Sequence, residues 1–207
     1  MGYSLIGFFY RIFIDPLISG LRKQLVSMIL PGDKVIDIAC GTGALSLEMS
    51  GRAGHVTGID LSEDMIVTSR LTARKRRIQN ITFELIDATD LSCYTDSSFD
   101  VAVSTLAMHQ FDPETGVKVL TEMKRLAKRV IIADYNCPMK PGPAKWLAWG
   151  IERIARGDHY RNFRIYMAAG GMQKLAGEAG LKISSLEERG SGVFIIALLS
   201  PDGMGKK

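Results

Sequence analysis

The sequence predicts an α/β fold: a doubly wound, seven-stranded, mostly parallel sheet with a C-terminal antiparallel hairpin strand. From Lys34 onward, short apolar runs alternate with amphipathic stretches of helical length, which is typical of parallel βαβ units. Near the end of the chain, two apolar runs within residues 181–200 flank Gly190-Ser191-Gly192, which indicates a β-hairpin. The length of 207 residues suggests one domain with, at most, a modest appendage.

Five strands are expected in order before the last third of the chain. Their ranges are 34–39, 55–60, 81–87, 99–105 and 129–136. Between the first two, Ala44–Met49 begins a helix. Ser62 can cap a second helix, whose first turn holds Glu63 and Asp64. A third helix spans 112–128, where apolar residues recur at three-residue steps.

The last third departs from this alternation. Prolines interrupt the chain after residue 137, and a helix carrying Trp146, Trp149 and Ile154 follows. A further helix covers 164–180. We expect the segment between these two helices, DHYRNF (158–163), to be a loop over the active edge of the sheet.

The first thirty residues are apolar but do not form a transmembrane segment. Arg11, Asp15, Arg22 and Lys23 interrupt a stretch that would need about 20 predominantly apolar residues to cross a bilayer. The segment also lacks the features of a secretory signal. A helix that covers a pocket is the favoured interpretation. A helix lying in a membrane interface, giving peripheral membrane contact, and a dimer contact are the alternatives, and the oligomeric state stays open.

Charge and cysteine usage narrow the function classes. The net charge is +4, which alone does not indicate nucleic-acid binding. Three widely spaced cysteines without a CxxC pair argue against a disulfide framework or a zinc site and favour a reducing compartment, the cytoplasm. We predict no metal site. The densest basic run is interpreted as the solvated end of a helix, with an anionic surface partner or a nucleic-acid footprint as alternatives. Its members are Arg70, Arg74, Lys75, Arg76 and Arg77.

A glycine loop, Gly41-Thr42-Gly43, directly follows the first strand. Such glycines let the backbone approach a ligand, and open α/β sheets bind ligands beyond the carboxyl ends of their strands. Asp37 would face the pyrophosphate of a dinucleotide but could help to hold a cationic amino group. Asp60, at the end of the second strand, is placed to accept both hydroxyls of a ribose. These features fit NAD or an adenosine carried in another form.

Four segments together resemble the motifs of class I S-adenosylmethionine-dependent methyltransferases, and most closely the ubiquinone/menaquinone-type small-molecule subfamily. They are VIDIACGTGALS (35–46), VTGIDLSEDMI (56–66), ITFELIDATDLS (81–92) and FDVAVSTLAMHQF (99–111). The resemblance implies a Rossmann-like methyltransferase fold and S-adenosylmethionine as cofactor, with S-adenosylhomocysteine as product. It divides the chain into a helical lid (1–30), a methyltransferase domain (31–200) with an acceptor-site insertion (138–165), and a flexible tail (201–207).

The resemblance also implies a role for each matching position. Asp37 would orient the methionine amino group, Asp60 would bind the ribose, and Asp87 would meet the adenine amine. Asp90 is the alternative residue for the contact with the adenine amine. Ala39 stands where the family has its first glycine. The other implied cofactor contacts are Gly41, Thr42 and Gly43 around the amino-acid moiety, Leu61, Met65 and Ala88 at the adenine, and Ser104, Thr105 and Leu106 at the sulfonium and methyl.

Methyl transfer is an in-line displacement, so the protein mainly aligns the nucleophile and excludes water, and a base is not obligatory. His109 is the candidate base, and packing against the cofactor is its alternative role. Acceptor contacts are expected from Tyr10, Tyr135, Asn136, His159, Tyr160, Arg161 and Asn162. For the last four of these, a solvated polar segment is the alternative.

The predicted function is therefore S-adenosylmethionine-dependent methylation of a small, possibly apolar, acceptor. Aromatic residues in the lid and in the late helix favour an apolar acceptor, and ordinary helix packing explains them equally well. Nucleic acid is not expected as a substrate, because STLAMHQ stands where amino-methyltransferases acting on DNA bases resemble one another in [ND]PP[YF]. The alternatives are a non-catalytic module that binds S-adenosylmethionine or S-adenosylhomocysteine, and an NAD-dependent oxidoreductase.

Overall fold

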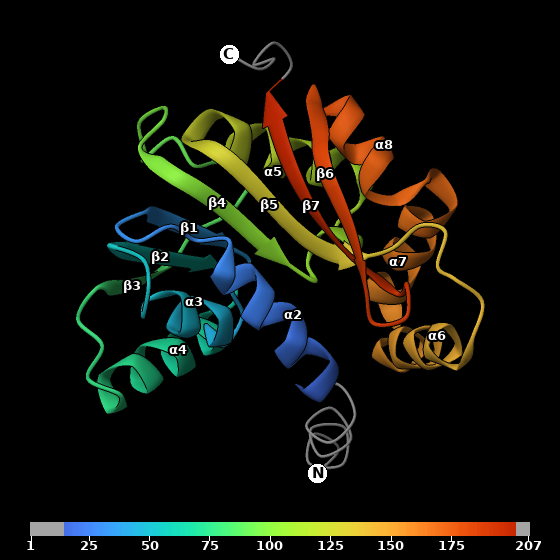
Figure 1. The fold of residues 1–207 in the computed structure, drawn as a ribbon, viewed down its shortest axis with the longest axis horizontal. Coiled ribbons are helices and arrows are strands. Elements are labelled where there is room, and N and C mark those ends of the chain that lie inside the picture. The colour runs from blue at the N-terminus through green and yellow to red at the C-terminus, as the bar shows by residue number, and fades with distance from the viewer. Residues whose placement is uncertain (1–14, 202–207) are drawn as a thin grey trace.

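A seven-stranded sheet organises the part of the chain that the structure, a computed structural model, describes: residues 15–201 (Figure 1). Tyr10 and most of the predicted lid lie outside these residues, as does the tail after residue 201. The strands are β1 (Lys34–Ile38), β2 (His55–Asp60), β3 (Ile81–Leu85), β4 (Phe99–Thr105), β5 (Ala127–Tyr135), β6 (Leu181–Arg189) and β7 (Phe194–Pro201). Their order in the sheet is β3-β2-β1-β4-β5-β7-β6.

The topology confirms the predicted fold class. β1 lies parallel to both β2 and β4, so that Ile36 is in register with Thr57 on one side and with Ala102 on the other. The chain order reverses between β1 and β4, which creates the crevice where open α/β sheets bind ligands. β7 runs antiparallel between β5 and β6. The predicted C-terminal hairpin is therefore present.

Helices cover both faces of the sheet (Figure 1). They are α2 (Asp15–Ser27), α3 (Ala44–Met49), α4 (Glu63–Lys75), the short 3-10 helix η2 (Met108–Gln110), α5 (Pro113–Leu126), α6 (Pro143–Ala155), α7 (Gly157–Ala169) and α8 (Gly171–Glu178). α2 packs beside α3 in front of the sheet in Figure 1, and α5 packs with α8 behind it. α6 and α7 lie at the end toward which the arrowheads of β4 and β5 point.

Local chemistry explains where two of these helices begin. Ser62 precedes α4 in an extended conformation, and its hydroxyl accepts a hydrogen bond from the backbone N–H of Met65, as predicted. Asp112 caps α5 in the same way and accepts a bond of 3.1 Å from the backbone N–H of Thr115. These caps fix the chain just after β2 and shortly after β4, where site residues were expected.

Two sequence-based predictions about the last third are wrong. The segment DHYRNF is not a loop but part of α7, because Phe163 and Tyr166 form a buried helical face with no glycine or proline to interrupt it. The single helix predicted for 164–180 is broken at Gly170 and Gly171, whose φ angles are +104° and +65°. A Cβ at Gly171 would lie 2.6 Å from Cys137 Cβ, so the break lets α8 approach the end of β5.

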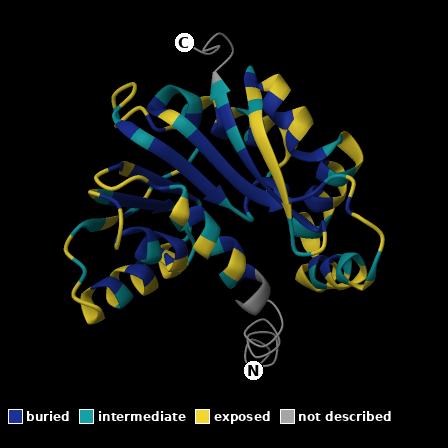
Figure 2. Ribbon diagram, in the orientation of Figure 1, coloured by how far each residue is buried: buried dark blue, intermediate teal, exposed yellow. Residues whose placement is uncertain are grey.

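The central strands form the core of the described residues (Figure 2). Their apolar side chains are fully buried from both faces, and each contributes roughly 1.5–3 kcal/mol relative to an exposed position. The exposed residues lie on the outward faces of the helices, in the loops and along the edge strand β6. The strand ends are thus held on a rigid frame. No helix within residues 15–201 has the length and apolar character that a membrane crossing requires.

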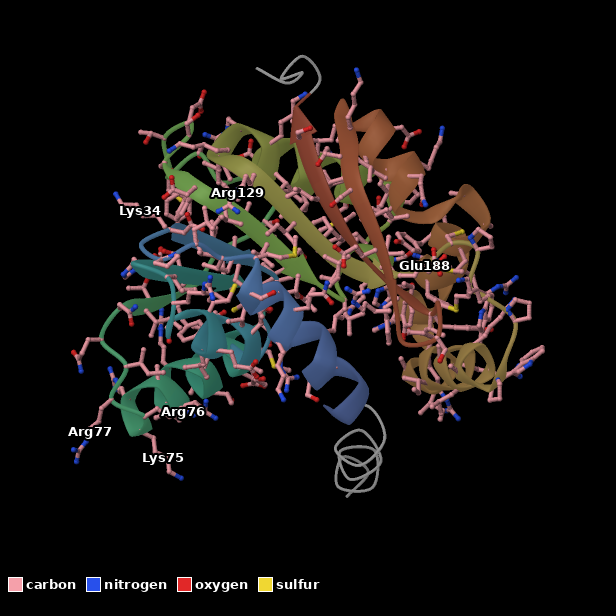
Figure 3. All side chains as sticks on the ribbon, viewed as in Figure 1. Lys34, Lys75, Arg76, Arg77, Arg129 and Glu188 are labelled. Carbon is pink, nitrogen blue, oxygen red and sulfur yellow. The ribbon has the colours of Figure 1, made fainter. Side chains whose placement is uncertain are left out.

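The basic run lies at the end of α4. Lys75, Arg76 and Arg77 extend outward from it (Figure 3). Arg70 instead turns back, and its guanidinium donates two hydrogen bonds to the carbonyl oxygen of Phe83 in β3. This placement fits the solvated helix end favoured by the sequence.

Candidate cofactor and acceptor site

The glycine loop connects β1 to α3, and its two glycines do different things. Gly41 has φ +54°, and a Cβ added there would meet no atom within 4 Å. Gly43 has φ +74°, and a Cβ there would lie 2.6 Å from the ring of Phe83 and 2.9 Å from Ser69 Cβ. Gly43 therefore permits the close packing of the loop on α4 and β3. Gly41 keeps its backbone open toward the strand ends, where a ligand can approach.

The sequence predicts Ala39 as the last residue of the first strand, but the structure places it just after the strand. β1 ends at Ile38, and Ala39 takes a left-handed conformation with φ +56°. An L-residue with a Cβ pays about 1–2 kcal/mol for this conformation, which glycine adopts freely. The structure thus gives a physical reason for the glycine that the resemblance places here. Thr42, which follows in the loop, is exposed.

Asp60 ties the glycine loop to the start of α4. Its Oδ2 accepts a hydrogen bond of 2.8 Å from the backbone N–H of Gly41, and its Oδ1 accepts one of 2.9 Å from Ser62. Each carboxylate oxygen keeps a further lone pair. Beside it, Leu61 and Met65 leave 72% and 39% of their surface exposed. A carboxylate next to an exposed apolar pair suits a ribose that carries a flat, largely apolar ring.

Asp37 lies beneath the loop, with only 2% of its surface exposed. The hydroxyl of Ser46 donates a hydrogen bond of 2.5 Å to its Oδ2. Burial raises the pKa of Asp37 from 3.8 to about 7; the bond from Ser46 opposes this rise, and the negative charge of Asp60 adds to it. A carboxyl held this way would gain from a cationic ligand group nearby.

The acids after β3 cap their own turns. Oδ1 of Asp87 accepts bonds of 2.8 Å from both the N–H and the hydroxyl of Thr89. Oδ1 of Asp90 accepts one of 3.1 Å from the N–H of Ser92. Both acids are exposed, and Ala88 between them is half-buried. Asp87 lies closer to the end of β3, at the sheet edge that carries Asp60.

Ser104, Thr105 and Leu106 lie at or just after the end of β4, and their polar groups differ in whether they have hydrogen-bond partners. Ser104 is fully buried, and its hydroxyl donates a bond of 3.0 Å to the carbonyl oxygen of Ile38, so its side chain links two strands. The hydroxyl of Thr105 is buried, and no hydrogen-bond partner for it occurs within residues 15–201. Leu106 has φ +53°, and its N–H donates to the carbonyl oxygen of Ala133. Of the three side chains, Thr105 thus has an unused polar atom.

His109 lies in η2 and forms a buried pair with Asp134 of β5. Its Nδ1 lies 2.6 Å from Asp134 Oδ1, and the exposed fractions of the two side chains are 2% and 0%. Burial acts to lower the pKa of His109, but the charge and hydrogen bond of Asp134, with the charge of Glu152, raise it above its usual value. Because Nδ1 faces a carboxylate, Nδ1 carries the proton and Nε2 offers its lone pair when the ring is neutral.

Glu152 of α6 joins this pair to α7. Its Oε1 accepts a bond of 2.8 Å from the hydroxyl of Tyr135 and lies 3.6 Å from His109 Nε2. Its Oε2 lies 2.7 Å from Nε2 of His159, which is one-third exposed. Burial acts to raise the pKa of Glu152, but the histidines and Tyr135 hold it below its usual value.

Sequence reasoning missed Asp134 and Glu152. Asp134 had a signal, since an acid inside the apolar strand RVIIADYN repeats the pattern of Asp37 in KVIDIA. Glu152 had none, because nothing local distinguishes it from a solvated acid on an amphipathic helix. Its role depends on how α6 docks against β5 and α7.

The structure brings some of the predicted acceptor residues together and separates others. Tyr135, His159 and Asn162 face the cluster around His109, and the Asn162 side chain donates to the carbonyl oxygen of Gln110. Tyr160 is half-buried and stacks on Phe163.

Arg161 and Asn136 have other partners in the structure, and their acceptor contacts stay predictions. Arg161 is exposed and pairs with Asp158 at 3.1 Å, because its position on α7 faces solvent. Asn136 donates a bond of 3.0 Å to the carbonyl oxygen of Gly192, so its side chain supports the turn between β6 and β7 rather than the acceptor side.

Comparisons with known proteins bear on the family and the fold of the chain. A family model described as "Methyltransferase domain" matches residues 29–175. The chain is 34% identical, over 120 residues, to the ubiquinone/menaquinone biosynthesis C-methyltransferase UbiE of Bdellovibrio bacteriovorus, a match covering 56% of this chain and 50% of that protein. It is 32% identical, over 108 residues, to the ubiquinone biosynthesis O-methyltransferase of Acinetobacter baumannii, covering 52% and 46%. The chain thus spans about half the length of these curated relatives.

The fold has close structural neighbours. The PH0226 protein from Pyrococcus horikoshii OT3 superposes with a TM-score of 0.70 at 22% identity, covering 94% of this chain and 98% of that one. A likeness at this identity concerns the arrangement of helices and strands. It agrees with the strand order and the antiparallel β7 described above.

Proposed function

The chain belongs to the methyltransferase-domain family, and we propose that it transfers the methyl group of S-adenosylmethionine to a small acceptor by in-line displacement. One observation carries the proposal: the open glycine loop, the Asp60 carboxylate and the exposed pair Leu61 and Met65 meet at one edge of the sheet. Family membership favours this function over an NAD-dependent oxidoreductase. The non-catalytic binding module is the alternative that activity measurements test.

The residues at the loop fit this cofactor. Gly41 leaves room for the amino-acid part, and Asp37 supplies a buried carboxyl for its cationic amino group. Asp60 has lone pairs left for the ribose hydroxyls, and Leu61 and Met65 offer apolar surface to the adenine. When bound, S-adenosylmethionine supplies a methyl carbon attached to a positively charged sulfur. The protein then needs to hold an acceptor in line behind that carbon and to keep water out.

We place the acceptor beside the cluster around His109. Aromatic rings surround this cluster: Tyr135 lies 4.7 Å from His109 and 5.2 Å from Phe163, and Trp149 lies 5.0 Å from Phe163, between ring centroids. These rings pack on one another, so an apolar or aromatic acceptor would suit the outer side of this cluster. In this arrangement the Nε2 lone pair of His109 is the atom that would accept a proton from the acceptor, if its chemistry requires one.

The cofactor assignment is tested by calorimetric titration with S-adenosylhomocysteine, with NAD as the control ligand. We expect binding of the first and none of the second. Asp60→Ala removes a charged hydrogen-bond partner and should weaken the binding by about 1.5–3 kcal/mol, or roughly 10- to 150-fold. Asp64→Ala, an exposed acid in the next helix, is the matched control and should leave the affinity unchanged. Unchanged affinity in Asp60→Ala would remove the ribose assignment.

The activity is tested by release of S-adenosylhomocysteine in the presence of candidate acceptors. The panel should contain aromatic and quinol-like compounds with both carbon and oxygen nucleophiles, because the two relatives named above are a C- and an O-methyltransferase. Turnover that depends on the acceptor supports the proposal. Cofactor binding without turnover on any member would favour the non-catalytic module.

We also propose that the protein works in the cytoplasm and binds no nucleic acid. Its three cysteines are all free, which suits a reducing compartment. Peripheral membrane contact is compatible with α6, which exposes 74% of Trp146 and 61% of Ile154. Sedimentation with lipid vesicles tests this contact.

A further inference from the structure

Two of the three histidines of the chain meet a buried acid between η2, α6 and α7. His109, Glu152 and His159 each offer a ligand atom, and these three atoms lie within 4.8 Å of one another. We propose that they bind a divalent transition-metal cation, for which Zn²⁺ is the best match. The sequence predicts no such site, because the two histidines lie far apart along the chain and no cysteine is spaced for metal binding.

The donor set and its spacing fit zinc. Two imidazole nitrogens and one carboxylate oxygen form a known catalytic zinc set, with a fourth position open to water or substrate. Ligand atoms around a tetrahedral zinc lie roughly 3.3 Å apart, given bonds of about 2.0–2.1 Å. Here Oε1 of Glu152 lies 3.6 Å from His109 Nε2, and its other oxygen, Oε2, lies 2.7 Å from His159 Nε2. Small side-chain shifts would bring the three atoms around one cation.

The surrounding groups already orient the ligands. Asp134 holds Nδ1 of His109 at 2.6 Å, which directs Nε2 of the ring toward Glu152. The Tyr135 hydroxyl donates to Oε1 of Glu152 and fixes the carboxylate. A carboxylate behind a ligating histidine and a hydrogen bond to a ligating carboxylate are typical supports of metal ligands in proteins.

Unsatisfied atoms and charge point to the same ligand. Oε2 of Glu152 and Nε2 of His159 are buried and lack an aligned hydrogen-bond partner within residues 15–201, although they lie 2.7 Å apart. Buried polar atoms are rarely left this way. Asp134 and Glu152 also place two carboxylates in this buried cluster, and carboxylates taken out of water need partners of opposite charge. A divalent cation between the ligands would replace this poorly aligned pair with metal bonds and place a positive charge beside the carboxylates.

The role of the cation in catalysis rests on the proposed function, and it replaces proton acceptance by His109, because an Nε2 that ligates the cation has no lone pair left for a proton. The cluster lies near the end of β5, at the same sheet edge as the glycine loop. An open coordination position there would bind an oxygen of the acceptor, which favours hydroxylated acceptors over those without one.

The test uses the full chain after dialysis against a chelator, titrated with Zn²⁺ alone. We expect one Zn²⁺ per chain. Binding should be lost in Glu152→Gln and in His159→Ala, and weakened about 10- to 100-fold in Asp134→Asn. His55→Ala is the matched control, because His55 lies on β2 next to Thr82, and it should bind as the parent does. Thermal unfolding of each variant shows whether it is folded, and His159 is exposed enough to replace safely.

Co²⁺ provides a second readout that does not depend on affinity. We expect the visible absorption of a four- or five-coordinate cobalt site without the charge-transfer band of a thiolate. Absence of binding to the parent chain, retained binding in folded His159→Ala and Glu152→Gln, or a thiolate band would each overturn the proposal. S-adenosylhomocysteine binding is measured separately on the metal-free chain, so that failure of the cation site and failure of the cofactor site are distinguishable.

Discussion

Asp37 is a buried acid that lowers the stability of the fold and that we propose to contact the cofactor. Its carboxyl is buried under the glycine loop, and among the described residues Ser46 alone donates a hydrogen bond to it. A second acid, Asp60, lies near enough to raise its pKa further. Neither neighbour compensates the charge. The loss of stability from burying this acid is explained if a cationic group of the ligand binds beside it. The proposed ligand has such a group, its protonated amino group.

The burial of Asp37 predicts how the free energy of unfolding of Asp37→Asn, relative to the parent, depends on pH. The pKa in the folded chain, about 7, lies above the ordinary value of 3.8, so the folded state binds this proton more tightly than the unfolded state. The free energy of unfolding of the parent therefore falls as the pH rises from about 4 to about 7, by about 4 kcal/mol at most. Asparagine does not ionise. Asp37→Asn should be more stable than the parent by an amount that grows over this range, yet bind S-adenosylhomocysteine more weakly.

Urea unfolding at several pH values from about 5 to about 8 measures the difference. Asp64→Asn, an exposed position, is the control and should show no such growth. A gap between Asp37→Asn and the parent that stays constant or shrinks with rising pH would mean that Asp37 is not a penalised buried acid.

At the scale of single residues, the sequence indicated acids that follow a simple rule. Asp37 and Asp60 lie within or at the end of apolar strands, and parallel strands bring their carboxyl ends to one edge. Asp134 obeys the same rule and was overlooked. Glu152 obeys no local rule, because only the docking of α6 and α7 brings it to His109. Tertiary contacts of this kind are not encoded in spacing.

At the scale of elements, the loop between β1 and α3 divides two tasks between two glycines. Gly43 meets Phe83 and Ser69 and so belongs to the packing of α3 against α4 and β3. Gly41 faces open space and is therefore accessible to the proposed ligand. Both have positive φ, and their side-chain environments alone distinguish them.

The pair predicts opposite effects of the same substitution. Gly43→Ala should lower the free energy of unfolding by roughly 2–4 kcal/mol, because its Cβ clashes with rigid neighbours in addition to the left-handed strain. Gly41→Ala should cost only about 1 kcal/mol, from strain alone, but weaken S-adenosylhomocysteine binding. Chemical denaturation and calorimetry measure the two quantities. Equal losses of stability in both variants would contradict this division of the loop.

Element boundaries in the Rossmann-like part were predicted well, because caps and apolar runs are local signals. β2 and β4 have the predicted bounds, and β1, β3 and β5 differ by one or two residues at their ends. The errors fall after β5. There the polar segment 158–163 has helical propensity but resembles a loop in composition, and the packing of Phe163 decides the outcome.

At the scale of the whole molecule, one sheet edge holds both proposed sites. β1 and β2 supply the cofactor side, and β4 and β5 lead to the cluster around His109, so the reversal of strand order separates a cofactor from an acceptor. Periodicity predicted the strands. Their order was not predicted and is given by the structure, because local patterns do not say which strands are neighbours.

If the two sites are separate, their ligands should stabilise the chain independently. S-adenosylhomocysteine at about 100 times its dissociation constant adds about 2.7 kcal/mol to the free energy of unfolding, which raises the Tm of a chain of this size by roughly 5–10 °C. Zn²⁺ at the same relative concentration adds a similar amount, and together the two gains should sum, because the proposed contacts share no residue. His159→Ala should abolish only the zinc gain, and Asp60→Ala should reduce only that of S-adenosylhomocysteine. Loss of both gains in either folded variant would show that the edge is one coupled site, with the acceptor side positioned by the cofactor side.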